Sequence, residues 1–150
     1  MIKRQAQAAF IFVALAMGVL PVSWAQTTPV GVWHSVDEKT GEASSELEIK
    51  EDAGVLTGVI KKVLRKNVAP DAVCGKCKDA LKDHPLVGLP IITEVRKAEG
   101  KDVWEGGKIL DPENGKTFNV RLTPAEAGKK LEVRGSFGPF SRTQIWQRVQ

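Results

Sequence analysis

The sequence lacks most of the residues and motifs by which an enzyme or a metal site is recognised. It has no tyrosine and two histidines among its 150 residues. It contains no Gly-x-Ser-x-Gly, no phosphate-binding loop and no His-Glu-x-x-His helix. No nucleophile can therefore be matched with a base, so we predict no catalytic residue, no metal and no cofactor. The sequence favours a non-enzymatic role.

An excess of charge of one sign is also missing. The chain has 22 Lys and Arg against 18 Asp and Glu, a net charge of +4, and the charges are interspersed. Nucleic acid is bound by a concentrated basic face. We therefore expect no nucleic-acid partner.

The first 25 residues have the features of a secretory signal peptide. Lys3 and Arg4 precede an apolar run from Ala8 to Leu20, and Ser23-Trp24-Ala25 is a small-x-small cleavage site. The apolar run is too short for a membrane-spanning helix, although a retained N-terminal anchor is the alternative. We predict cleavage after Ala25 and a periplasmic or secreted protein of residues 26–150 with no membrane span.

The rest of the chain reads as short strands separated by turns. Trp104 to Phe118 is the clearest hairpin, because Asp111-Pro112-Glu113-Asn114-Gly115 carries the residues that tight turns require. Gly106-Gly107 inside its first strand indicates a sharp bend or a close backbone approach. Strands are expected at 31–36, 45–50, 55–64, 86–95, within the hairpin 102–122, at 131–135 and at 142–149.

About eight strands and no amphipathic helix predict an all-β fold, either a barrel or a sandwich. An eight-stranded antiparallel barrel can enclose packed side chains or one small ligand. We therefore expect a single antiparallel barrel at residues 26–150, with one long loop at 65–85.

Gly31 and Trp33 on the first strand, with Arg148 on the last, resemble the lipocalin and wider calycin pattern. The resemblance implies that Trp33 closes one end of the barrel and that a guanidinium lies across its indole as a cation–π contact. Arg142 is the other candidate, but Arg148 directly follows Trp146-Gln147 in the body of the strand. These three residues predict a fold rather than a ligand.

The chain from residue 31 to residue 148 also resembles an uncharacterised family of exported bacterial proteins, domain of unknown function 2147. The resemblance implies a lipocalin-like periplasmic or secreted barrel, and it implies no settled activity. It rests on Cys74-x-x-Cys77, Lys82-Asp-x-Pro85-Leu-Val-Gly88, Gly106-Gly107-Lys-Ile-Leu-Asp111-Pro-Glu-Asn-Gly115-Lys, Val133-Arg134-Gly135 and Arg142-Thr143-Gln144-x-Trp146-x-Arg148.

Cys74 and Cys77 lie in the long loop, and in an oxidising compartment we expect them to form a disulfide. A redox role is the alternative, because Lys76 would lower a thiol pKa. A metal site with His34 or His84 is disfavoured, and the residue after Cys77 is lysine, which excludes haem attachment.

The expected function is binding of a small apolar or amphiphilic ligand in the barrel. A thiol or redox activity at the cysteines and an envelope protein-interaction module are the alternatives. Phe137 and Phe140, in a Gly-Pro turn, either form a patch for a partner or fold back onto the barrel end. The candidate cavity residues lie on apolar phases of the strands: Leu47, Ile49, Phe118, Val120, Leu131 and Val133.

Overall fold

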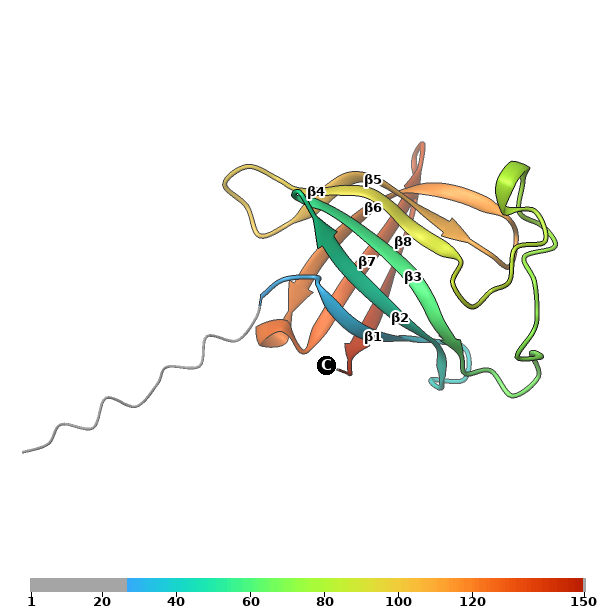
Figure 1. Cartoon of the computed structure of the whole chain (residues 1–150). Coiled ribbons are helices and arrows are strands. Elements are labelled where there is room, and N and C mark those ends of the chain that lie inside the picture. The colour runs from blue at the N-terminus through green and yellow to red at the C-terminus, as the bar shows by residue number, and fades with distance from the viewer. Residues whose placement is uncertain (1–26, 150) are drawn as a thin grey trace, which may run out of the picture.

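Eight antiparallel strands close into one barrel in sequence order (Figure 1). The computed structural model describes residues 27–149, so the predicted signal peptide lies outside the described residues. The predicted all-β barrel is confirmed. The strands are β1 (Gly31–Val36), β2 (Ala43–Asp52), β3 (Val55–Val63), β4 (Pro90–Lys97), β5 (Trp104–Asp111), β6 (Lys116–Ala125), β7 (Lys130–Phe137) and β8 (Phe140–Arg148).

The connections alternate between two ends of this up-and-down barrel. The closed end carries the turns 53–54 and 98–103 and the short 3-10 helix η2 (Glu126–Gly128). The open end carries the turns 37–42, 112–115 and 138–139 and the long loop 64–89. This loop contains the other 3-10 helix, η1 (Asp79–Leu81). None of the helices in residues 27–149 is long and apolar enough to cross a membrane.

A tryptophan and an arginine plug the closed end. Trp33 is fully buried and its indole Nε1 donates to the Pro29 carbonyl at 2.8 Å. The Arg148 guanidinium lies 4.1 Å from the centre of the Trp33 ring. It donates to the carbonyls of Gly128, Val30 and Thr28, and its burial lowers the pKa of Arg148. Arg148 thus ties the last strand to the segment that precedes the first.

A continuous hydrophobic core fills the barrel above this plug. Each large apolar side chain contributes about 1.5–3 kcal/mol to the stability of the fold when it is fully buried. The core residues with the lowest exposure or the largest side chains are Trp33, Trp104, Trp146, Leu47, Ile49, Leu56, Leu89, Ile92, Val95, Leu122 and Leu131.

Strand β5 bends at Gly106-Gly107, as expected. The register with β6 shifts between Trp104 and Gly107, and Gly106 has a φ of +84°. A Cβ on Gly107 would lie 2.1 Å from the carbonyl oxygen of Thr93, so the backbones of β4 and β5 approach closely there. The bend lets the sheet curl into a barrel.

The largest differences between predicted and observed strand boundaries are at the start of β4 and the end of β6. Residues 86–89 belong to the long loop rather than to β4, and Leu89 is fully buried beneath it. The hairpin expected to end at residue 122 continues to Ala125, because Thr123 and Pro124 extend β6 opposite Glu132 and Leu131 of β7. The pairing with β7 outweighs the turn preference of the proline.

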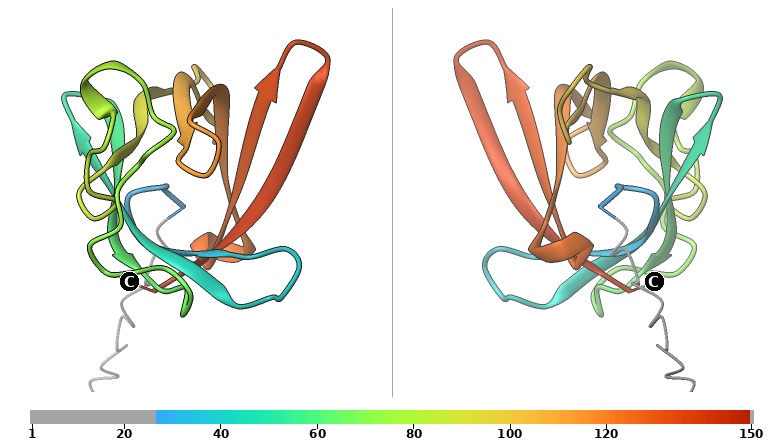
Figure 2. Two further views of the ribbon diagram at one scale, coloured as in Figure 1. Left: turned by 90° about the vertical axis from the view of Figure 1, so that its right-hand side faces the viewer. Right: turned by 90° about the vertical axis from the view of Figure 1, so that its left-hand side faces the viewer.

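The seam between the first and last strands is short. Within the described residues, the register pairs between β1 and β8 are Trp33 with Arg148 and His34 with Gln147. By contrast, β7 and β8 pair along their whole length, from Lys130 to Phe137. Figure 2 shows the β7–β8 hairpin leaning away from the β1–β2 hairpin towards the open end. The barrel is therefore closed at one end and flared at the other.

Arg148 should be the most sensitive charged residue for stability. Changing Arg148→Gln removes a cation–π contact and leaves several buried carbonyls without a donor, at a cost of about 2–4 kcal/mol in the free energy of unfolding. Urea unfolding measures this cost. Arg121→Gln is the matched control, since Arg121 makes an exposed ion pair with Glu105 worth about 1 kcal/mol or less. Equal effects of the two changes would contradict the role given to Arg148.

Candidate functional site

An apolar wall lines the inner face of β5 to β7 at the flared end. Ile109 and Phe118 are register partners and both are half-buried. A Cβ on Gly135 would lie 3.6 Å from the Cβ of Phe118 and 3.8 Å from the Cγ2 of Ile109. Gly135 thus presents no side chain of its own to Phe118 and Ile109, which face the interior.

The inner face of β8 becomes polar towards the open end. Trp146 is buried, and its Nε1 lies 3.3 Å from the Oε1 of Gln144, the next inward position. Arg142 follows one step higher, opposite Gly135 of β7, and its side chain is 64% exposed. A ligand in the flared end would therefore meet an apolar wall on one side and a neutral amide and a guanidinium on the other.

A two-point ion pair bridges the opening between β8 and the β1–β2 turn. The Nε and Nη2 atoms of Arg142 lie 2.9 and 2.8 Å from the two carboxylate oxygens of Glu38. The hydrogen bond from Arg142 to Glu38 raises the pKa of Arg142, and Asp111 and Asp37 add to the effect. Because this pair is exposed, it holds the two hairpins together weakly.

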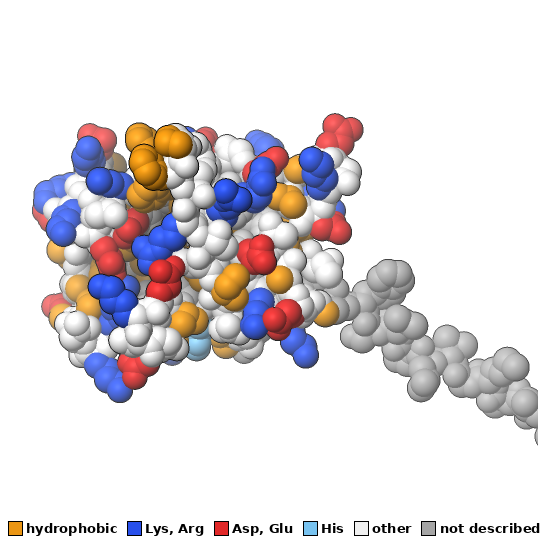
Figure 3. All heavy atoms as spheres, turned by 180° about the vertical axis from the view of Figure 1, so that it is seen from behind, with side chains coloured by type: hydrophobic (Ala, Val, Ile, Leu, Met, Phe, Trp, Pro, Cys, Tyr) orange, Lys and Arg blue, Asp and Glu red, His pale blue; other side chains and the backbone are white. Residues whose placement is uncertain are grey.

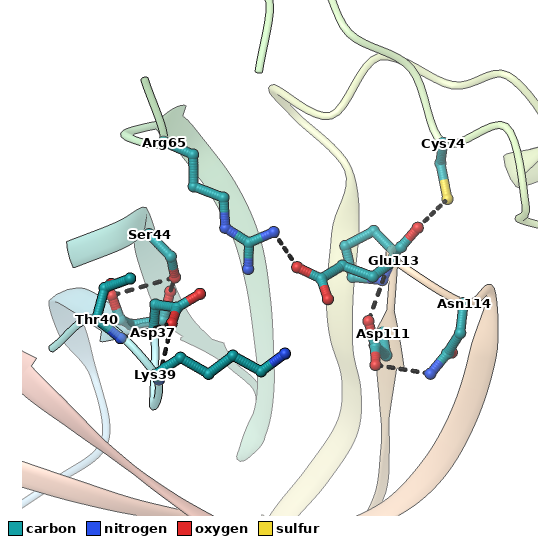
Figure 4. Close-up of polar contacts among 11 residues, drawn as sticks. Asp37, Lys39, Thr40, Ser44, Arg65, Cys74, Asp111, Glu113 and Asn114 are labelled. Atoms are coloured by element: carbon teal, nitrogen blue, oxygen red, sulfur yellow. Dashed lines mark hydrogen bonds and ion pairs between the residues drawn. The ribbon is translucent and has the colours of Figure 1, made fainter. Parts of the chain in front are cut away.

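The rim next to this pair is built from turn chemistry (Figure 4). Asp37 accepts hydrogen bonds from the backbone N–H groups of Lys39 and Thr40 at 2.9 and 3.1 Å, and these bonds lower the pKa of Asp37. Asp111 and Asn114 likewise fix the β5–β6 turn through a 2.8 Å hydrogen bond. Their carboxylate and amide groups are used by the turns, as the sequence predicted for Asp111.

Arg65 crosses the open end from the end of β3 to the β5–β6 turn, where it forms an ion pair with Glu113 (Figure 4). Its Nε is buried and has no hydrogen-bond partner among the described residues. Beside it lies a hollow of about 260 Å³ between the β1–β2 turn and the start of the long loop. This is slightly smaller than the typical site of a small-molecule ligand, which is about 300–1,000 Å³.

The long loop covers the other half of the open end. Cys74 and Cys77 form a disulfide, and both residues are buried in the core cluster. Cys74 Sγ lies 3.6 Å from the carbonyl oxygen of Pro112, and a Cβ on Gly115 would lie 1.9 Å from the carbonyl oxygen of Lys76. The loop is therefore packed directly on the β5–β6 turn, and Figure 2 shows it on the opposite side of the barrel end from the β7–β8 hairpin.

The predicted cavity residues divide between the core and the mouth. Phe118 lies on the accessible wall, whereas the other five are buried in the hydrophobic core. Ile109, Arg142 and Gln144 also face inward and were not among the predicted cavity residues. Strand alternation could have identified the two β8 residues, because every second residue before the buried Trp146 faces inward. The five that lie in the core are Leu47, Ile49, Val120, Leu131 and Val133.

The described ring contacts of the two histidines are with groups other than the cysteines. His34 is on the outer face of β1, 3.2 Å from a carboxylate oxygen of Glu46, and His84 contacts the Pro85 carbonyl through Nδ1 at 2.7 Å. Within residues 27–149, no group of three or more His, Cys, Asp or Glu side chains is placed to hold a metal ion.

Comparison with known proteins agrees with this architecture. Residues 31–148 match the model of the family described as "Uncharacterized protein conserved in bacteria", domain of unknown function 2147. The chain belongs to this family. Among curated proteins, none matches the sequence.

A solved structure has a similar fold at low sequence identity. It is the protein HP1028 from Helicobacter pylori, described as belonging to the lipocalin family. It is 20% identical, with a TM-score of 0.67 over 81% of this chain and 82% of that chain. This similarity establishes a lipocalin-like fold for members such as this chain.

The buried disulfide should resist reduction while the protein is folded. Thiol reagents attack accessible sulfur atoms, and here the loop and the β5–β6 turn cover them. We expect dithiothreitol to reduce Cys74–Cys77 about tenfold or more slowly in native protein than in urea. Alkylation followed by mass spectrometry measures both rates. Equal rates would restore the redox interpretation.

Proposed function

We propose that this barrel binds one small apolar or amphiphilic molecule in its flared end. The observation that carries the proposal is the wall of Ile109 and Phe118, two inward-facing apolar side chains that are only partly buried. Sites for small ligands are typically apolar with a few convergent polar groups. The mouths of β-barrels are frequent positions for such sites.

The arrangement favours a ligand whose apolar part points inward. The floor of the mouth is the core residue Trp146, whereas the groups nearer to solvent are Gln144 and Arg142. The polar end of a ligand placed beside Gln144 and Arg142 can form hydrogen bonds with them and remain in contact with water. A carbon chain or ring lies against Phe118. The ligand class is therefore an amphiphile with a compact polar end.

The N-terminal sequence supports export of the protein, so the ligand is sought in the cell envelope or outside the cell. The burial of both cysteines disfavours the thiol-based alternative. An interaction with another protein is the remaining alternative, and it needs no cavity.

Substitution of the apolar wall should weaken ligand binding. Phe118→Ser and Ile109→Ser each remove apolar contact area and should lower the affinity for the neutral probe N-phenyl-1-naphthylamine about tenfold or more. Fluorescence titration measures this affinity. Native mass spectrometry of protein from the exported fraction identifies the natural adduct and the N-terminal residue.

Ile145→Ser is the matched control, because Ile145 lies on the outer face of β8 and is 39% exposed. Its affinity for the probe should equal that of the original protein. Thermal unfolding of each variant separates loss of the site from loss of the fold. Probe affinity that is unchanged in the folded Phe118→Ser and Ile109→Ser variants would refute the proposal.

A further inference from the structure

The C-terminal hairpin differs in charge from the rest of the chain. From Val133 to the last residue the sequence contains three arginines and no Asp or Glu. The sequence around its turn is Arg134-Gly-Ser-Phe-Gly-Pro-Phe-Ser-Arg142. Each phenylalanine has a serine beside it, and an arginine lies one or two positions beyond each serine. The hairpin is apolar at its tip and basic behind it.

The phenylalanines do not fold back onto the barrel end. Phe137 and Phe140 are register partners on either side of the turn, with 68% and 75% of their surface exposed. They lie on the inward phase of β7 and β8, but the flare leaves no strand opposite them within the described residues. Figure 3 shows apolar side chains gathered in a raised cluster at this end of the molecule, with basic side chains behind it.

Two arginines lie behind the tip on the outer face of the sheet. Arg134 of β7 is the register partner of Arg121 of β6, and it donates to the Ser141 hydroxyl at 3.0 Å. Two like charges opposite each other are unfavourable. Glu105 pairs with Arg121 at 2.8 Å, whereas the described side-chain contact of Arg134 is with Ser141. Among the described residues, the contacts of Arg121 and Arg134 include no carboxylate other than that of Glu105.

A hollow of about 500 Å³ lies beside the two arginines. Gly106 and Gly107 lie on its lining where β5 bends, and a Cβ on Gly106 would meet nothing within 4 Å. Asn119 and Ser136 provide further polar groups on its lining. The hollow has room for an anionic group such as a phosphate and has guanidinium donors at its edge.

We propose that the β7–β8 tip, defined as residues 134–142, docks the protein on a bilayer that contains anionic phospholipids. Phe137 and Phe140 enter the boundary between headgroups and acyl chains, which peripheral segments reach to a depth of about 5–10 Å. Arg134 is three residues behind Phe137, or about 10 Å along the strand. This spacing places Arg134 and Arg121 at the level of the lipid phosphates.

The size and shape of the tip favour a bilayer over a protein partner. A stable protein–protein interface buries about 800 Å² on each partner. A two-residue turn with two phenylalanines presents much less area. A fluid interface needs no complementary pocket, and its negative potential attracts basic residues, each contributing about 1 kcal/mol. The docking requires no ligand in the mouth, so it does not depend on the proposed function.

Vesicle binding tests the proposal on protein recovered after export. The vesicles contain phosphatidylethanolamine and phosphatidylglycerol, and pure phosphatidylcholine vesicles are the comparison. We expect sedimentation with the anionic vesicles and much less with the neutral ones. Phe137→Ser combined with Phe140→Ser should weaken binding about tenfold or more. Arg134→Gln should weaken it on the order of fivefold and reduce its dependence on salt.

Val73→Ser combined with Val87→Ser is the matched control, since both valines are exposed apolar residues of the long loop, at 47% and 45%. This variant should bind vesicles like the original protein. The tip variants should keep their affinity for the apolar probe, and Phe118→Ser should keep vesicle binding, so the two proposals fail separately. Equal binding to both vesicle types, or binding unaffected by the phenylalanine changes, would overturn the docking proposal. Self-association through the tip without vesicle binding would also overturn it.

Discussion

The short seam between β1 and β8 is the constraint on which the rest of this structure depends. β1 has six residues, and its register with β2 is shifted between Ser35 and Val36. Within the described residues, β1 therefore pairs with β8 at Trp33 and His34. At the same level, Arg148 donates a hydrogen bond to the segment that precedes β1. Above that level, β8 is held by β7. The accessible mouth and the projecting hairpin are two consequences of this single geometry.

The long loop makes the open end asymmetric. Its disulfide is packed into the core near Pro112, and the tight contact between Gly115 and Lys76 fixes it on the β5–β6 turn. A disulfide across so few residues constrains little of the unfolded chain, so its effect is local. Its role is to shape a loop that has little regular structure. The loop lies over the β5–β6 side of the barrel end, away from the β7–β8 hairpin.

Local features of the sequence predicted much of the fold. Alternation identified the strands, Asp-Pro-Glu-Asn-Gly identified a turn, and Gly106-Gly107 identified a bend. The site was less predictable, because alternation tells which face a residue occupies but not its depth. Leu131 and Arg142 both face inward, yet one is fully buried and the other exposed. That difference depends on where the seam ends, which is a contact between residues more than a hundred positions apart.

The exposed aromatic side chains connect stability with function. Burying a phenylalanine contributes about 1.5–3 kcal/mol, and a small domain is stable by only about 5–15 kcal/mol in total. Phe137 and Phe140 gain little of this in the isolated chain, although both lie on the inward phase of their strands. A longer β1 would cover them and would also close the mouth. Three of the four tryptophans, Trp33, Trp104 and Trp146, instead lie in the core, where they stabilise the barrel without contacts from its open end. Because stability is supplied there, the flared end is free to present apolar surface to a ligand or a bilayer.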